Sequence, residues 1–216
     1  DIALTNTIFT FCSGEFDFAV WNENHTAYIK MERTESDEVL YLQTKLDKNP
    51  VTRFLAFSAL FEREMVRLLE DENASPSEAF AKEVMRTLKD EELMQSCGAM
   101  PLLMFESVSD PRFSHAYAKL YSAKQKILRN IAGLFKEELL GLYAKYAETL
   151  PKNGFCPAVL SAQFKRNAVR NLILTILAAL DSADVQELIS TQYYTAESAT
   201  VRLSALSLYL AVWVSY

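Results

Sequence analysis

The stretch from Gln163 to Leu180 constrains the fold more than any other part of the sequence. Its second half, from Leu172 to Leu180, is apolar except for Thr175. A helix that is apolar on every side has to be surrounded by other protein elements. We therefore predict a central helix over this stretch, with other helices packed against it.

Polar side chains are concentrated in the first half of the same stretch. They are Lys165, Arg166, Asn167, Arg170 and Asn171. Arg166 and Arg170 are four residues apart and share one helical face, and the two asparagines have the same spacing. Because buried polar groups are normally paired within a scaffold, we interpret these side chains as tethers to the ends of neighbouring helices.

Helical periodicity begins near Pro50, where large apolar residues start to recur every three or four positions. Asp47 or Asn49 can cap this helix, and Pro50 suits its first turn. The polar residues at 71–73 are expected to end it.

The tetrapeptide Ser75-Pro76-Ser77-Glu78 predicts the start of the next helix, with Ser75 as the cap and Glu78 completing a capping box. Further helices are predicted over residues 90–96, 101–107, 111–146, 184–194 and 198–214. Antiparallel helix pairs joined by short turns are typical of a superhelical array. Since no strict sequence repeat is present, we expect an irregular array.

Residues 1–46 differ from the rest because β-branched and aromatic residues alternate there with polar ones. Three or four strands are predicted, over Thr5–Phe11, Phe16–Trp21, His25–Met31 and Glu38–Thr44. The predicted fold is therefore mainly α. An irregular helical array of α-α pairs over residues 47–216 is preceded by a few β-strands over residues 1–46.

The net charge of −6 and the pI near 5.1 bear on possible partners. Nucleic acids and anionic membrane surfaces call for a basic footprint, so we expect neither as the main partner. No apolar run is long enough for a membrane span. The three cysteines, Cys12, Cys97 and Cys156, are far apart, which is typical of reduced thiols and favours a cytoplasmic location.

The sequence offers few residues for chemistry. Its two histidines, His25 and His115, form no metal-binding motif, and phosphate-loop and serine-hydrolase motifs are absent. The adjacent carboxylates at 70–72, 90–92 and 137–138 are expected on solvated surfaces. We expect Tyr193 and Tyr194 to pack in a corner between helices. No catalytic, cofactor-binding or metal-binding residue is assigned.

Six stretches, taken in order and spacing, carry a family resemblance. They are Asp47–Phe54, Pro76–Glu92, Leu93–Ser109, Asp110–Tyr146, Lys165–Asn171 and Gln192–Leu206. Together they resemble the C-terminal half of the aminopeptidase N family of zinc metallopeptidases, over roughly residues 38–210. The sequence departs from the family at Val51, where the family often has Phe, and at Ser198–Val201, which replaces an Asn-Met-Thr-Asp step.

The resemblance implies a fold and a role for each part of the chain. Residues 1–46 resemble the end of a small β-sandwich, and residues 47–216 resemble the helical domain. We expect this domain to be truncated at its C-terminus, because the chain ends on the apolar stretch Leu206–Tyr216. The family removes single residues from peptide N-termini with a zinc held by His-Glu-x-x-His and a downstream Glu, all N-terminal to this chain.

This portion is accordingly expected to be non-catalytic, to cap the active site and to restrict substrate access. Its expected partners are the catalytic domain of the same polypeptide and peptide substrates, with zinc in the parent protein and none bound by this chain. Gly98-Ala99-Met100 matches only part of the family's Gly-Ala-Met-Glu-Asn substrate loop. A stand-alone helical scaffold that binds a protein partner is the alternative, and an upstream His-Glu-x-x-His would decide against it.

Overall fold

A computed structural model of the protein describes residues 18, 35–147 and 156–214, without the side chains of 212–214. These residues form eight α-helices and two short 3-10 helices. The α-helices are α1 (Asp37–Leu46), α2 (Pro50–Glu70), α3 (Glu78–Leu88), α4 (Glu91–Cys97), α5 (Tyr117–Lys145), α6 (Pro157–Ala178), α7 (Ala183–Thr195) and α8 (Ala199–Val214); the 3-10 helices are η1 (Met100–Leu102) and η2 (Pro111–Phe113).

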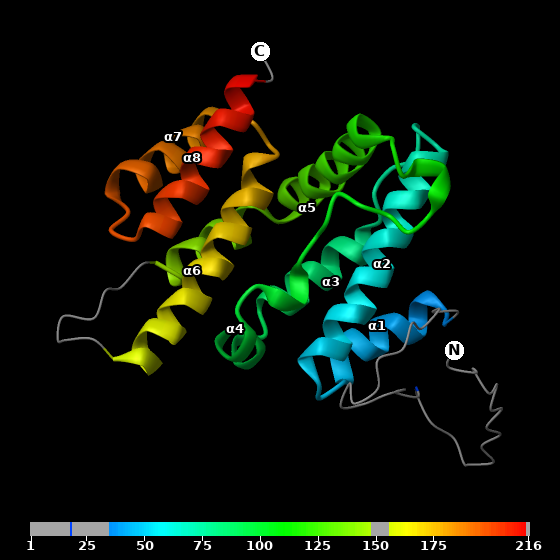
Figure 1. Ribbon diagram of the computed structural model, residues 1–216, viewed down its shortest axis with the longest axis horizontal. Helices are drawn as coiled ribbons and strands as arrows, with labels where there is room; N and C mark the ends of the chain where they lie inside the picture. The colour runs from blue at the N-terminus through cyan, green and yellow to red at the C-terminus, as the bar shows by residue number, and fades with distance from the viewer. Residues whose placement is uncertain (1–17, 19–34, 148–155, 215–216) are drawn as a thin grey trace, which may run out of the picture.

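Helices that follow one another along the chain mostly lie next to one another (Figure 1). The α1–α2, α5–α6 and α7–α8 pairs have the most extensive contacts, and α2 and α3 also pack against α5. Helices α1 and α2 lie at one end of the molecule and α6, α7 and α8 at the other, with α3, α4 and α5 between them. The prediction of a mainly α, irregular helical array is thus confirmed for the described part of the chain.

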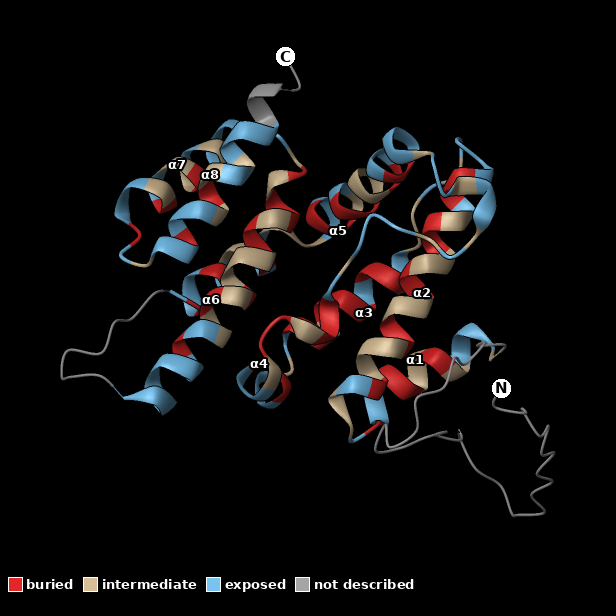
Figure 2. Cartoon of the chain, in the orientation of Figure 1, coloured by how far each residue is buried: buried red, intermediate tan, exposed pale blue. Residues whose placement is uncertain are grey.

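Each α-helix contains buried residues (Figure 2), and the apolar ones among them form one continuous core. In α6, the side chains of Val169, Ile173, Leu174, Ile176 and Leu177 are fully buried. This helix contacts α4, α5, α7 and α8. The prediction of a central helix surrounded by other helices is therefore confirmed.

The prediction of a strand over Glu38–Thr44 is wrong, because these residues belong to α1. Leu40, Gln43 and Thr44 are its buried residues, and they share one helical face that packs against α2. The helical part therefore begins at Asp37 rather than at Asp47. The other predicted strands lie outside the described residues, apart from Phe18, which is in no regular element.

The start of α3 differs from the predicted capping box. Ser77, not Ser75, is the cap, and its hydroxyl accepts a hydrogen bond from the N–H of Phe80 at 3.3 Å. The reason lies in α2, where the Glu64 carboxylate accepts the N–H of Ser77 at 2.6 Å and Arg67 donates to the carbonyl of Ser75 at 2.6 Å. These two bonds hold residues 75–77 outside the helix.

Two other boundaries need correction. The helix predicted over 101–107 is only the 3-10 turn η1, and the one predicted from 111 begins as η2, with α5 starting at Tyr117. Helix α5 bends at Phe135, which has φ −129° and ψ 27°. A Cβ added to Gly133 or Gly141 of the same helix would meet nothing within 4 Å. Of Asp47 and Asn49, the two residues expected to cap α2, Asn49 is the cap, and its side chain accepts a hydrogen bond from the N–H of Val51 at 2.9 Å.

Candidate functional site

A buried polar junction joins α5, α6, α7 and α8 at one point. The Tyr143 hydroxyl of α5 donates to Oε1 of Gln192 in α7 at 2.7 Å. Nε2 of Gln192 donates to Oδ1 of Asn171 in α6 at 3.2 Å and to the carbonyl of Val201 in α8 at 3.3 Å. Gln192 is only 1% exposed, so its amide depends on these partners.

Two arginines of α6 lie against tyrosine rings of α5. Arg170 donates from Nη2 to the Tyr143 hydroxyl at 3.0 Å, and its guanidinium carbon lies 4.5 Å from the centre of that ring. Arg166 donates from Nη2 to the carbonyl of Lys145 at 2.9 Å and lies 5.6 Å from the centre of the Tyr146 ring. Burial raises the pKa of the Tyr143 phenol, an effect that Arg170 partly opposes.

The interpretation of the α6 polar residues as tethers is confirmed for three of them. Arg166 and Arg170 bond to α5, and Asn171 bonds to α7. Asn167 is an exception among the side chains, because it accepts from Gln163 of its own helix at 2.7 Å. The backbone of Lys165 lies close to Gly98, since a Cβ added to Gly98 would lie 3.2 Å from the Cα of Lys165.

The Gly98-Ala99-Met100 tripeptide connects α4 to η1, and Met100 is the first residue of η1. Gly98 has φ 64° and ψ −141°, a conformation that glycine adopts far more readily than other residues. The tripeptide thus allows the end of α4 to approach α6 closely.

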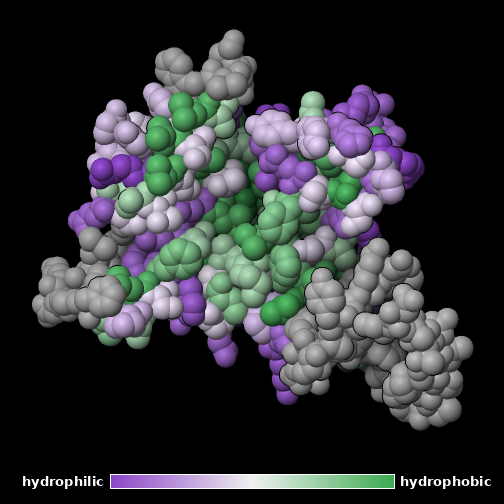
Figure 3. Space-filling view, viewed as in Figure 1, coloured by the Kyte–Doolittle hydropathy of each residue, from purple (hydrophilic) through white to green (hydrophobic). Residues whose placement is uncertain are grey.

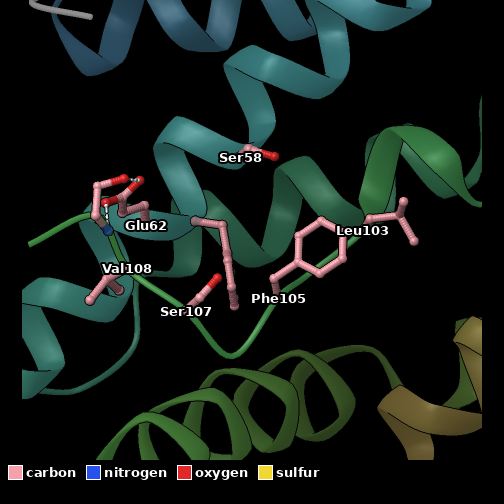
Figure 4. A pocket seen from close by; sticks show the side chains of 8 residues that line it. Ser58, Glu62, Leu103, Phe105, Ser107 and Val108 are labelled. Carbon is pink, nitrogen blue, oxygen red and sulfur yellow. Dashed lines mark hydrogen bonds between the residues drawn. The ribbon is translucent and has the colours of Figure 1, made fainter. Parts of the chain in front are cut away.

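A small pocket lies between α2 and the segment after η1 (Figure 4). It is a cavity of about 190 Å³ lined by Ser58, Phe61, Glu62, Leu103, Phe105, Ser107, Val108 and Ser109. Both carboxylate oxygens of Glu62 accept hydrogen bonds from Ser109. The hydroxyl of Ser58 is buried without a partner within the described residues. Because no histidine lines the pocket and Glu62 is already engaged, the lining provides no nucleophile paired with a base.

A second, more open groove of about 340 Å³ lies between α7 and α8. Its lining includes Tyr193, Arg202 and Leu203, and Arg202 donates to the carbonyl of Ala196 at 2.7 Å. The rings of Tyr193 and Tyr194 meet edge to face at 5.1 Å. Tyr193 packs against the core as predicted. Tyr194 is 77% exposed, so the prediction that it packs between helices is wrong.

The carboxylate runs lie near the surface, where they pair with basic residues from other elements. Asp90 binds Arg53 at 3.1 Å, and Glu91 binds Lys145. The remaining pairs between elements are Glu138–Lys89, Glu70–Arg112 at 2.7 Å and Glu72–Lys119 at 3.0 Å. These carboxylates therefore connect helices, although each exposed pair contributes little stability by itself.

The described residues hold no group of three or more His, Cys, Asp or Glu side chains that could bind a metal ion. His115 is exposed in the turn before α5, whereas His25 lies outside the described residues. Cys97 and Cys156 are free thiols, whereas Cys12 lies outside the described residues. Among the helices described, none is both long and apolar enough to cross a membrane.

Residues 37–213 match the sequence model of a family described as "Domain of unknown function (DUF3458_C) ARM repeats". The chain belongs to this family, the C-terminal helical domain of aminopeptidase N-like proteins. ARM repeats are stacked helix pairs, which agrees with the observed array.

A solved structure has the same fold. The crystal structure of Legionella pneumophila aminopeptidase A in complex with aspartic acid matches with a TM-score of 0.72 and 17% sequence identity. The match covers 87% of this chain but only 23% of that one, so this chain spans about a quarter of the aminopeptidase. A comparison with curated protein sequences gave no match.

Proposed function

We propose that this chain is the non-catalytic C-terminal portion of a zinc-dependent aminopeptidase that removes N-terminal residues from peptides. The observation that carries the proposal is the family match over residues 37–213, which coincides with the described helices. The zinc and its ligands belong to the catalytic domain of the same polypeptide. The whole protein would act in the cytoplasm.

Within that enzyme, this portion covers the active site and limits which substrates enter. Exposed apolar side chains support such a contact surface, since large apolar patches on soluble proteins commonly mark interaction sites. Phe105 is 55% exposed, and Leu203 and Leu210 of α8 are 60% and 54% exposed. Figure 3 shows apolar side chains over α8 and around the middle of the viewed face. Their partner in this proposal is the catalytic domain.

The activity is tested on the whole gene product that contains this chain. We expect it to bind zinc stoichiometrically, to release amino acids from short peptides and to lose this activity with a chelator. The isolated chain of 216 residues should neither bind zinc stoichiometrically nor release amino acids from peptides. A native product near 24.5 kDa without such activity would contradict the proposal and favour a helical scaffold.

The covering role needs a separate experiment. Two substrates carry the same four N-terminal residues, one as a free tetrapeptide and one as the first residues of a folded protein. We expect rapid removal of the first residue from the tetrapeptide and little from the folded protein, because an enclosed site admits only small or flexible chains. Equal rates for the two substrates would contradict the covering role.

A further inference from the structure

The guanidinium groups of Arg166 and Arg170 have donors that the fold does not use. Each arginine makes one hydrogen bond through Nη2, to a carbonyl or a hydroxyl. Both Nη1 groups reach solvent and have no hydrogen-bond partner in the described part of the chain. Since the two residues are four apart in α6, these groups project from adjacent turns of one helical face.

Neither arginine forms an ion pair with any carboxylate of residues 35–147 or 156–214. The acids whose charge acts on the neighbouring Tyr146 are Asp90 and Glu91, and these already bind Arg53 and Lys145. Helix α6 itself contains three basic residues and no acidic one. By contrast, every arginine of α2 and α3 forms an ion pair with a carboxylate; these are Arg53, Arg63, Arg67 and Arg86.

The two guanidinium groups are also held in place. Each lies over a tyrosine ring that is itself buried, with Tyr143 6% and Tyr146 3% exposed. Stacking on an aromatic ring and a fixed Nη2 bond leave little freedom to lose when a ligand binds. The Nε groups of both arginines are buried without a partner, so the internal hydrogen bonds leave these charges incompletely compensated.

We propose that Arg166 and Arg170 form a binding site for the carboxylate of a peptide. Planar guanidinium groups match the geometry of a carboxylate, whose two oxygens can accept from the two free Nη1 groups. Guanidinium groups bind carboxylates and phosphates alike, so the arginines by themselves indicate an anionic oxygen ligand. The choice of a peptide carboxylate rests on the proposed function, in which this portion of the enzyme meets peptide substrates.

The test compares two probes on the complete chain. Acetyl-tetra-alanine with a free C-terminal carboxylate and the same peptide with a C-terminal amide are titrated by calorimetry at equal ionic strength. We expect the acid to bind at least about tenfold more tightly than the amide, since one lost charge-assisted contact changes affinity by about that factor. Arg166→Gln and Arg170→Gln should each remove most of this preference.

Arg129 provides a matched control. It also donates to a helix-end carbonyl, that of Ala179 at 3.0 Å, and it forms no ion pair in the described chain. It has no second arginine on the adjacent turns, so Arg129→Gln should keep the preference for the acid. Equal binding of the two peptides, or a preference that survives both α6 variants, or one that Arg129→Gln removes as well, would overturn the site.

Salt provides a second measurement if a glutamine variant fails to fold. Binding of the acid to the unaltered chain should weaken as salt rises, whereas weak binding of the amide should not. An acid affinity that does not change with salt would overturn the site. Failure of the proposed function is detected separately, as absent peptide hydrolysis by the whole gene product.

Discussion

The hydroxyl of Tyr143 donates to the side-chain oxygen of Gln192 at 2.7 Å, across 49 residues of sequence. Both side chains are buried, and the same hydroxyl accepts from Arg170. Tyr143→Phe leaves the amide oxygen and the guanidinium without this partner. We expect a loss of about 1–3 kcal/mol in the free energy of unfolding, measured with urea. Tyr194→Phe, at an exposed position, should change it by less than about 0.5 kcal/mol. Equal effects would contradict the importance of the polar junction.

Gly98 and Gly133 should respond in opposite directions to alanine. Gly98 has a positive φ, and its added Cβ would meet the backbone of Lys165 at 3.2 Å, so Gly98→Ala should destabilise the protein by more than about 1 kcal/mol. Gly133 lies in α5 with open space around it, so Gly133→Ala should stabilise by about 0.5–1 kcal/mol. Thermal unfolding of both variants tests this difference in sign. A stable Gly98→Ala protein would show that α4 does not need its close approach to α6.

Ile173 lies in the apolar second half of α6 and is 0% exposed. Ile173→Ala should cost about 2–5 kcal/mol, because it removes buried methyl groups and leaves a cavity. Leu203→Ala, at a position 60% exposed, should cost much less when measured by the same urea unfolding curves. If the two costs are similar, then α6 is not the packed centre of the array.

The Tyr41 phenol should lose its proton at an unusually high pH. Burial, followed by the negative charges of Asp37, Glu64 and Glu83, raises the pKa of Tyr41 from 10.0 to about 12. The folded state therefore favours the neutral phenol, and the resulting stabilisation is complete below pH 10 and is lost as the pH rises towards 12. Tyrosinate absorbance should show a step near pH 12 that is missing in Tyr41→Phe. A step that stays in this variant would assign it to another tyrosine.

The sequence predicted the long helices best, because several local signals agree there. Helix α2 has an Asn cap, a first-turn proline and regular apolar spacing, and α6 has an apolar second half. The error at α1 has a different origin. In a short segment such as Glu38–Thr44, positions i and i+4 share a face in a strand and in a helix alike, so few residues distinguish the two periods. Only the packing of Leu40 and Gln43 against α2 decides between them.

Contacts between residues that are distant in sequence explain the structural features that the sequence did not predict. The cap at Ser77 depends on Glu64 in another helix, and the need for glycine at 98 depends on Lys165. Arginine and asparagine at helical spacing in α6 did predict tethers, since such groups need partners when buried. The identity of Gln192 as the partner of Asn171 could not be predicted, because it follows from how α7 packs on α6.

The central position of α6 also affects how the chain is made. Residues 157–178 leave the ribosome after α4 and α5, which α6 covers in the finished protein. Until then, the nascent chain exposes the apolar faces of those two helices, and exposed apolar surface promotes aggregation. Synthesis of α6 therefore supplies the surface that buries these two faces.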